Sequence, residues 1–147
     1  MNDKDIVEIL LVEDNSRDAE LTIRALKKHN LANRLFHVED GAEAVDFLFA
    51  CGKYEGRRTD ISPKVVLLDL KLPKVNGLEV LRLMKNDPQL RAIPVVVVTS
   101  SAEDPDIRAA YDLGVNGYVI KPVQFDAFME AMSHLGVYWL IVNHPMK

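Results

Sequence analysis

Short apolar runs alternate along the chain with longer segments in which apolar residues recur every three or four positions. The short runs predict buried β-strands, and the wider spacing predicts amphipathic helices. The predicted strands cover residues 6–12, 33–39, 65–69, 93–98 and 117–120. The predicted helices cover residues 15–29, 42–50, 78–85, 104–114 and about 124–143. Strand and helix alternate five times, which is typical of right-handed βαβ units around a parallel sheet.

The polarity of the strands predicts their order in that sheet. The first, third and fourth predicted strands are the most apolar and should lie at its centre, whereas the more polar second strand belongs at an edge. The predicted fold class is therefore α/β, a doubly wound flavodoxin-like (βα)5 fold with strand order 2-1-3-4-5. Ligands of such sheets bind at the carboxyl ends of the strands, beside the switch point between the first and third strands.

Local signals describe the first predicted helix in more detail. Asn15 or Ser16 is the expected N-cap, because both side chains can accept a hydrogen bond from a free backbone N–H. Asp18 and Glu20 favour the positive end of the helix. The side chains expected to face the core are Leu21, Ala25 and Leu26.

Proline and glycine mark the ends of the fourth predicted helix. Asp104 is the expected N-cap, with Pro105 at the first helical position. Gly114 is expected to close this helix.

Three carboxylates follow the two strands that flank the switch point. Glu13 and Asp14 end the first strand and Asp69 ends the third, so we expect all three to meet at one edge of the sheet. Carboxylates so close repel one another, and unless they bind a cation at least one should have a raised pKa. An oxygen-only ligand set suits Mg²⁺ that keeps several waters. The alternative is that only one carboxylate points inward and the others are solvated.

The two remaining strands at this edge end in complementary groups. Thr99 supplies a hydroxyl after the fourth strand and Lys121 an ammonium after the fifth. Metal, hydroxyl and ammonium together could neutralise a phosphoryl group in transfer, with Asp69 as the nucleophile that forms an acyl phosphate. Taken singly, Thr99 is an ordinary strand-end hydroxyl and Lys121 an ordinary solvated charge.

Composition narrows the class of protein. The 147 residues, 48% hydrophobic and 27% charged, favour one soluble globular domain. A net charge of −4 argues against a nucleic-acid partner. No apolar run approaches the roughly 18 residues of a membrane span, and the polar N-terminus lacks the apolar core of a signal peptide. The single cysteine, Cys51, excludes an intramolecular disulfide and fits a cytoplasmic location.

Four sequence motifs resemble the receiver domain of two-component response regulators, the CheY-like family. They read Leu-Val-Glu-Asp-Asn at 11–15, Leu-Leu-Asp-Leu-Lys-Leu-Pro at 67–73 with Gly77, Val-Val-Thr-Ser at 97–100, and Gly-Tyr-Val-Ile-Lys-Pro at 117–122. The match covers about residues 6–136. The resemblance implies one receiver domain over residues 1–147, with a core at about 6–136 and a C-terminal helical extension at about 137–147.

The resemblance also implies a function for the carboxylates. It implies that Asp69 accepts a phosphoryl group from a sensor histidine kinase, in a signalling protein that catalyses only its own phosphorylation and dephosphorylation. Asp14 and Asp69 would bind Mg²⁺ directly and Glu13 through water. The backbone carbonyl of Lys71 would be a further metal ligand.

Other roles implied by the resemblance concern the phosphoryl group and the switch. Thr99 and Lys121 would bind the phosphoryl oxygens. Tyr118 resembles the aromatic residue that turns inward when Thr99 moves towards the phosphate; the alternative is a half-buried strand aromatic. Lys71 and Ser101 resemble the positions that tune hydrolysis of the acyl phosphate.

A narrower resemblance is carried by Gly52-Lys53-Tyr54-Glu55 and by the terminal Tyr138-Trp139-Leu140. These segments are similar to the single-domain regulators paired with bacterial and cyanobacterial phytochromes. The resemblance implies that the kinase partner is a phytochrome-type, light-regulated histidine kinase.

The C-terminal segment continues an apolar helical spacing beyond the usual end of a receiver domain. We expect its helix to run through Gly136 to about Asn143, and we expect output by protein contacts, with no DNA-binding domain.

A terminal helix apolar on all sides is usually covered. We predict a symmetric homodimer through it, the alternative being that it folds back on its own domain. The apolar positions are Phe125, Phe128, Met129, Met132, Leu135, Trp139 and Val142.

Two other functions compete with this interpretation. A Mg²⁺-dependent phosphohydrolase of the haloacid dehalogenase type would use the same aspartyl nucleophile, but its general-acid Asp would stand where Lys71 is. A flavin-binding module would need a Ser/Thr/Gly phosphate loop after the first strand, where Glu13 and Asp14 would repel phosphate.

Overall fold

The computed structural model describes residues 7–28, 34–121, 126 and 130, and within them five parallel strands form one sheet in the order β2-β1-β3-β4-β5. The strands are β1 (Ile9–Val12), β2 (Leu35–Val38), β3 (Val65–Leu68), β4 (Val95–Thr99) and β5 (Gly117–Ile120). The helices are α1 (Ser16–Lys28), α2 (Gly41–Leu48), α3 (Gly77–Lys85) and α4 (Asp104–Asp112), with a 3₁₀ turn η2 (Gly52–Tyr54). The predicted fold class and strand order are confirmed.

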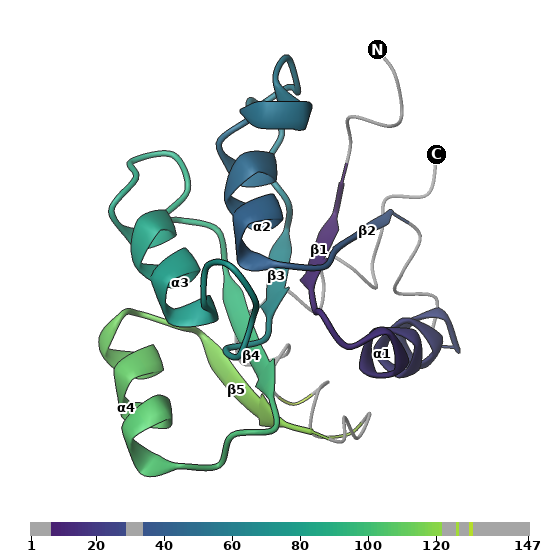
Figure 1. The fold of residues 1–147 in the computed structure, drawn as a ribbon, viewed down its shortest axis with the longest axis vertical. Helices are drawn as coiled ribbons and strands as arrows, with labels where there is room; N and C mark the ends of the chain where they lie inside the picture. Colours follow the sequence, from purple (N-terminus) through teal and green to yellow (C-terminus); the bar gives the residue numbers. More distant parts are fainter. Residues whose placement is uncertain (1–6, 29–33, 122–125, 127–129, 131–147) are drawn as a thin grey trace.

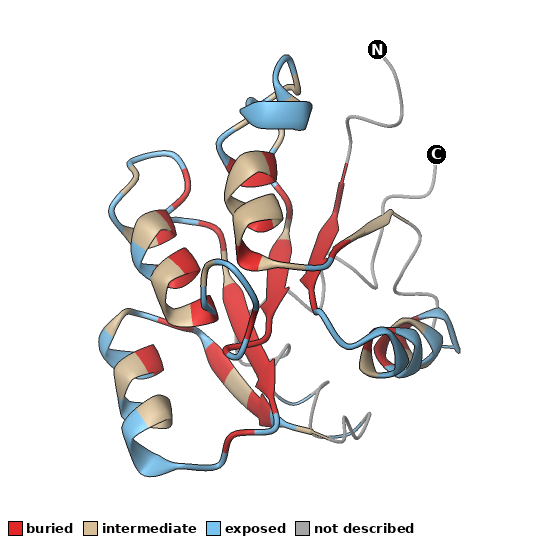
Figure 2. Cartoon of the chain, in the orientation of Figure 1, coloured by how far each residue is buried: buried red, intermediate tan, exposed pale blue. Residues whose placement is uncertain are grey.

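The layers of the molecule explain the polarity of its strands. Helices α2, α3 and α4 lie along one side of the sheet and α1 on the other (Figure 1). Every residue of β1, β3 and β4 is buried, whereas β2 at the edge is half-buried except for Val38 (Figure 2). Each fully buried Val or Leu side chain contributes about 1.5–3 kcal/mol of transfer free energy, so these central strands carry most of the core.

The inward face of α1 differs from the prediction. Leu21 is 49% exposed, and the buried residues of this helix are Ala19, Thr22 and Leu26. Positions 19, 22 and 26 follow the three- and four-residue spacing of one helix stripe, and 21 lies across the helix from them. The prediction for Leu21 was wrong because the apolar character of a residue does not decide which face of the helix it occupies. The buried face of α1 includes the small Ala19 and the polar Thr22.

The helix caps agree with the sequence signals at most positions. Asn15, Asp40 and Asn76 each accept a hydrogen bond from a backbone N–H in the first turn of the helix that follows. At α4 the N-cap is Glu103, and Asp104 is already helical, which corrects the expected cap. The shift by one residue is compatible with Pro105 because the first N–H groups of a helix have no partner within the helix.

The segment after α2 packs more closely than a polar loop. Tyr54 of η2 meets the rings of Phe36 and Phe47 edge-on, with centroids 5.8 and 5.2 Å away.

The predicted last helix and the C-terminal extension lie outside the described residues, apart from the exposed helical residues Asp126 and Glu130. In the part of the chain that the structure describes, no helix has both the length and the apolarity to span a membrane.

The loop between β3 and α3 returns close beneath the end of β3. The Gly77 N–H donates to the carbonyl of Leu70 at 2.8 Å. A Cβ atom at Gly77 would lie 2.2 Å from the carbonyl oxygen of Asp69 and 2.6 Å from the Cα of Leu70. The backbone that carries Asp69 therefore depends on a residue without a side chain at position 77.

We expect Gly77→Ala to lower the free energy of unfolding by about 2–3 kcal/mol, because rigid backbone must move to admit the methyl group. Gly56→Ala is the control, since a Cβ there meets nothing within 4 Å and only the positive φ of 91° resists it. That control should cost about 1 kcal/mol. Urea unfolding measures both, and an equal loss in the two variants would contradict the steric argument.

Candidate functional site

Parallel register brings the carboxylates together at one edge of the sheet. Val12 of β1 pairs with Leu68 of β3, so the residues that follow these strands emerge side by side. One ligand oxygen from each of Glu13, Asp14 and Asp69 lies within 4.8 Å of the others. Glu13 and Asp69 are 1% and 6% exposed, whereas Asp14 faces solvent.

Lys121 lies at the centre of this cluster. Its backbone N–H donates to the carbonyl of Thr99 at 2.8 Å, which extends the pairing of β4 and β5 by one step and sets the start of the side chain. Its ammonium lies 2.8 Å from Glu13 Oε1 and 2.9 Å from Asp69 Oδ2. A third carboxylate oxygen, Asp18 Oδ2 of α1, lies 2.9 Å from the same nitrogen.

Burial and pairing act in opposite directions on these charges. Burial raises the pKa of Glu13 to about 7, and the nearby Lys121 ammonium opposes this shift without cancelling it. For Lys121, burial alone would lower the pKa, but hydrogen bonds to Glu13, Asp18 and Asp69 outweigh it and raise the pKa above its usual value. Lys121 therefore stays charged near neutral pH, whereas Glu13 exchanges its proton there.

Backbone and ring groups hold the remaining atoms of Glu13 and Asp69. The Asn15 N–H donates to Glu13 Oε2 at 3.2 Å, and His37 Nε2 donates to the Glu13 carbonyl at 2.7 Å. The Lys71 N–H lies 3.3 Å from Asp69 Oδ1, with the Lys71 side chain exposed. Each carboxylate is thereby oriented by the loop that follows its own strand.

The residues after β4 form a second hydrogen-bonded group. Thr99 is fully buried, and its Oγ1 accepts from the Ser101 N–H at 3.4 Å. The Tyr118 hydroxyl donates to the Ser101 carbonyl at 2.9 Å, and the Ser101 hydroxyl donates to Asp106 Oδ2. Tyr118 is half-buried and its ring stacks on Tyr111 with centroids 6.5 Å apart. The structure thus ties the tyrosine to the loop that begins at Thr99.

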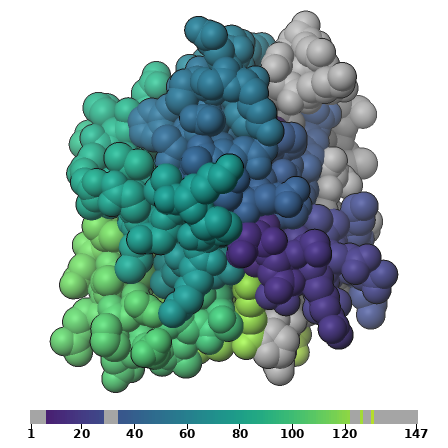
Figure 3. Space-filling model, in the orientation of Figure 1, coloured from purple at the N-terminus to yellow at the C-terminus, as the bar shows by residue number. Residues whose placement is uncertain are grey.

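An open cleft of about 510 Å³ gives access to the acidic cluster. The cleft is lined by Asp14, by Asp106 of α4 and by residues of the β3–α3 loop, Lys71 among them. Figure 3 shows the purple start of the chain against the teal segment that contains this loop. Asp69 itself is buried, and the exposed member of its cluster, Asp14, lines the open space.

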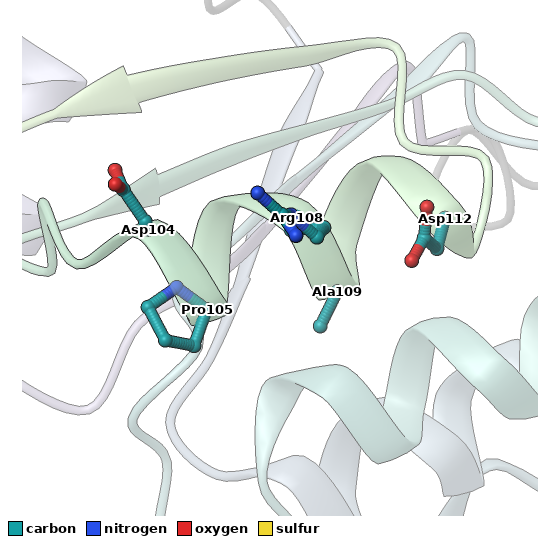
Figure 4. A pocket seen from close by; sticks show the side chains of 5 residues that line it. All are labelled: Asp104, Pro105, Arg108, Ala109 and Asp112. Atoms are coloured by element: carbon teal, nitrogen blue, oxygen red, sulfur yellow. The ribbon is translucent and has the colours of Figure 1, made fainter.

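A second hollow, of about 420 Å³, runs along α4 and is separate from this cluster (Figure 4). It contains none of the predicted site residues. Its lining residues are Asp104, Pro105, Arg108, Ala109 and Asp112.

Three residues that contact the site were not predicted for it. Asp18 was expected only to favour the positive end of its helix, although that end points at the same sheet edge as the carboxylates. His37 lies near the carboxyl end of β2, which could have placed it there. Asp106 offered no comparable signal, because its contact depends on how α4 sits over the loop from β4.

The donor set suits a hard divalent cation. Three carboxylates supply only oxygen ligands, which is the preference of Mg²⁺ and related ions, and the exposed Asp14 leaves room for retained water. Glu13, Asp14 and Asp69 could therefore hold a metal ion. Two of these carboxylates are the ones that Lys121 contacts, so a cation would compete with the ammonium for them.

Comparison with known proteins identifies the family. Residues 9–133 match the family model described as the response regulator receiver domain. The chain belongs to this family. The receiver domain is a signalling module, and the strand order, acidic cluster and strand-end lysine described above lie within the matched residues.

Relatives of this receiver domain come from several signalling systems. It is 45% identical over 132 residues to the "Probable methanogenesis regulatory protein FilR2" of Methanothrix harundinacea, covering 90% of this chain and 83% of that protein. It is 39% identical over 132 residues to "Response regulator Rcp1" of Synechocystis, covering 90% of this chain and 88% of Rcp1. A solved structure of the Mn²⁺-bound form of Rcp1 matches with a TM-score of 0.75 at 37% identity, covering 94% of this chain and 96% of that one.

A bacteriophytochrome response regulator, AtBRR, is also similar in structure. Its TM-score is 0.82 at 52% identity, and the match covers 95% of this receiver domain and 99% of AtBRR. The homologues of this chain therefore include phytochrome-associated response regulators.

The raised pKa of Glu13 predicts how pH changes the stability of metal-free receiver domain. The folded pKa is about 7 against 4.5 in the unfolded chain, so between these values only the folded protein holds the proton. Its free energy of unfolding should fall as pH rises through this window, by on the order of 3 kcal/mol from Glu13 alone. Urea unfolding in excess chelator should show this decline in wild type and lose it in Glu13→Gln.

Added Mg²⁺ should reverse this pH dependence, because metal ligands must be deprotonated. Glu55→Gln, an exposed glutamate away from the cluster, should behave as wild type. Identical pH profiles for wild type and Glu13→Gln would contradict the assignment of the shift to Glu13.

Proposed function

We propose that this receiver domain is a two-component response regulator that accepts a phosphoryl group from a sensor histidine kinase on Asp69, with Mg²⁺ bound. The observation that carries the proposal is the position of Asp69. Its carboxylate is buried against Lys121 at 2.9 Å and shares the acidic cluster with Glu13 and Asp14, and this cluster meets an open cleft at Asp14. A purely structural carboxylate would need neither the cleft nor the extra negative charges.

In the proposed reaction an Asp69 carboxylate oxygen attacks phosphorus and forms the acyl phosphate. The bond between phosphorus and the kinase histidine breaks, and the imidazole nitrogen keeps the electron pair. Bound Mg²⁺ would supply positive charge against the phosphoryl oxygens. Asp14 and Asp69 would be its direct ligands, Glu13 a ligand through water, and the Lys71 carbonyl a further ligand.

The strand-end residues would complete the binding of the phosphoryl group. Lys121, already charged and 11% exposed, would bind one oxygen through its ammonium, and Thr99 another through its hydroxyl. The protein would catalyse only its own phosphorylation and dephosphorylation, with Lys71 and Ser101 tuning the latter. A phosphohydrolase is disfavoured because the position of its general acid holds Lys71, whose side chain is exposed.

The contacts after β4 support a route from phosphorylation to output. The phosphoryl group adds about −1.5 to −2 charge at the strand ends and would draw Thr99 towards it. Since the Ser101 N–H contacts Thr99 Oγ1 and the Ser101 carbonyl accepts from Tyr118, movement of Thr99 would displace the tyrosine. Output would then pass through protein contacts on the face that carries Tyr118.

The proposed donor is a phytochrome-type histidine kinase. The name of the bacteriophytochrome response regulator AtBRR, together with the similarity at Gly52-Lys53-Tyr54-Glu55, supports this partner. The FilR2 similarity is the competing indication, because that name refers to a different process. Transfer rates from purified autophosphorylated kinases of both kinds would rank the donors.

Acetyl phosphate with Mg²⁺ should add one acid-stable, base-labile phosphoryl group to the wild-type protein, because Asp69 is the nucleophile. Asp69→Asn should take none, as measured by intact mass. Asp112→Asn, in the last turn of α4, is the matched control and should be modified like wild type. Incorporation that survives Asp69→Asn would contradict the assignment.

The homodimer through the last helix stays a prediction of the apolar sequence pattern at residues 125–142. Multi-angle light scattering after size exclusion should give twice the chain mass at tens of micromolar. A monomer at that concentration would favour the alternative, in which the helix folds back on its own domain. Repeating the measurement on phosphorylated protein would show whether the modification changes the association.

A further inference from the structure

Asp18 joins the first helix to Lys121, the residue that directly follows β5. It lies in the first turn of α1, where its N–H donates to Asn15 Oδ1 at 2.9 Å. Its carboxylate accepts from the Lys121 ammonium at 2.9 Å, across 103 residues of sequence. An acid in the first turn of a helix is favoured by the helix dipole without any cation, so a direct contact with Lys121 needs a separate explanation.

The ammonium of Lys121 uses all its hydrogen-bonding capacity in this structure. An ammonium has three N–H donors, and three carboxylates lie at 2.8–2.9 Å from this nitrogen. Two of them, Glu13 and Asp69, belong to the acidic cluster that could hold a cation. Asp18 does not belong to that cluster.

A bound cation would not affect the three carboxylate contacts of the Lys121 ammonium equally. A divalent ion at the cluster draws on the same two carboxylates, Glu13 and Asp69, as the ammonium, and it would weaken both of those contacts. The Asp18 contact is the one that the ion does not compete for. Because a lysine side chain has a flexible four-carbon stem, its ammonium needs an anchor to stay beside Asp69 at that stage.

The surroundings of Asp18 suit this role. Its side chain is 35% exposed and that of Lys121 only 11%, so Asp18 closes the outer side of the ammonium. The other two N–H groups then remain directed at the Glu13 and Asp69 side. We propose that Asp18 is a positioning residue, which anchors the Lys121 ammonium so that it meets an oxygen of the phosphoryl group on Asp69 once the cation is bound.

The inference rests on the proposed phosphorylation of Asp69, and a small phosphoryl donor tests it without any contribution from kinase docking. With acetyl phosphate and saturating Mg²⁺, Asp18→Ala should lower the second-order rate constant for phosphorylation about tenfold. This is less than the ~10²-fold loss typical when a charge-stabilising donor is removed altogether, because Lys121 is still present. Asp18→Glu restores a carboxylate in the same helical turn and should recover the rate to within about threefold of wild type.

Glu20→Ala is the matched control. It removes a carboxylate from the same helix, one that is exposed and pairs with Arg24 of the next turn at 3.3 Å. Its phosphorylation rate should equal that of wild type. If Asp18→Ala unfolds at the assay temperature, the isosteric Asp18→Asn replaces it, and its rate should fall in the same direction.

A second measurement separates positioning from a general effect on the helix. Beryllofluoride on Asp69 mimics the phosphoryl group, and its fluorine NMR signals report the donors around each fluorine. In Asp18→Ala the resonance of the fluorine that faces Lys121 should shift, while the spectrum of Glu20→Ala should match wild type. Loss of helix stability alone would leave that resonance in place.

Two results would overturn the inference while leaving the proposed function intact. They are a rate for Asp18→Ala within twofold of wild type, and fluorine resonances that do not change in that variant. Wild-type protein that takes no phosphoryl group at all would instead overturn the proposed function, and this inference with it.

Discussion

The ion pairs of one buried ammonium stabilise the whole carboxyl edge of the sheet. Glu13 and Asp69 emerge from neighbouring parallel strands with little access to water, and their charges repel. Lys121 lies within 2.9 Å of both and compensates this repulsion in the absence of a cation. Burial of the Glu13 carboxylate, with a smaller contribution from Asp69, still raises its pKa to about 7, because Lys121 opposes these effects only in part. Lys121 thus holds the carboxylates together in an arrangement to which a divalent cation can bind.

The same lysine connects distant parts of the chain. Its backbone extends β5, its side chain reaches the ends of β1 and β3, and Asp18 brings in the start of α1. A change in where the ammonium binds would therefore act on the ends of β1 and β3 and on α1. On the other side of Asp69, Thr99 and Ser101 link the β4 end to Tyr118 and to Asp106 of α4. The carboxyl edge of the sheet is thus linked to α1 through Lys121 and to α4 through Ser101.

Membership of the receiver family accounts for the architecture of the sheet. FilR2, Rcp1 and AtBRR each match 90% or more of this chain, although FilR2 is named for methanogenesis and AtBRR for a bacteriophytochrome. The architecture alone therefore does not identify the signal that the protein receives.

Periodicity and strand polarity in the sequence were sufficient to predict the five parallel strands, the four helices between them, the strand order and the edge at which Glu13, Asp14 and Asp69 lie. These features follow from local patterns and from the few topologies open to parallel sheets. Which face of α1 is buried, and which side chains of different elements contact one another, were decided only by the tertiary structure. It buried Ala19 and Thr22 instead of Leu21, placed Asp18 on Lys121, and joined Ser101 to Asp106. Such contacts join residues by how helices settle on the sheet, and packing of that kind leaves no periodic signal in the sequence.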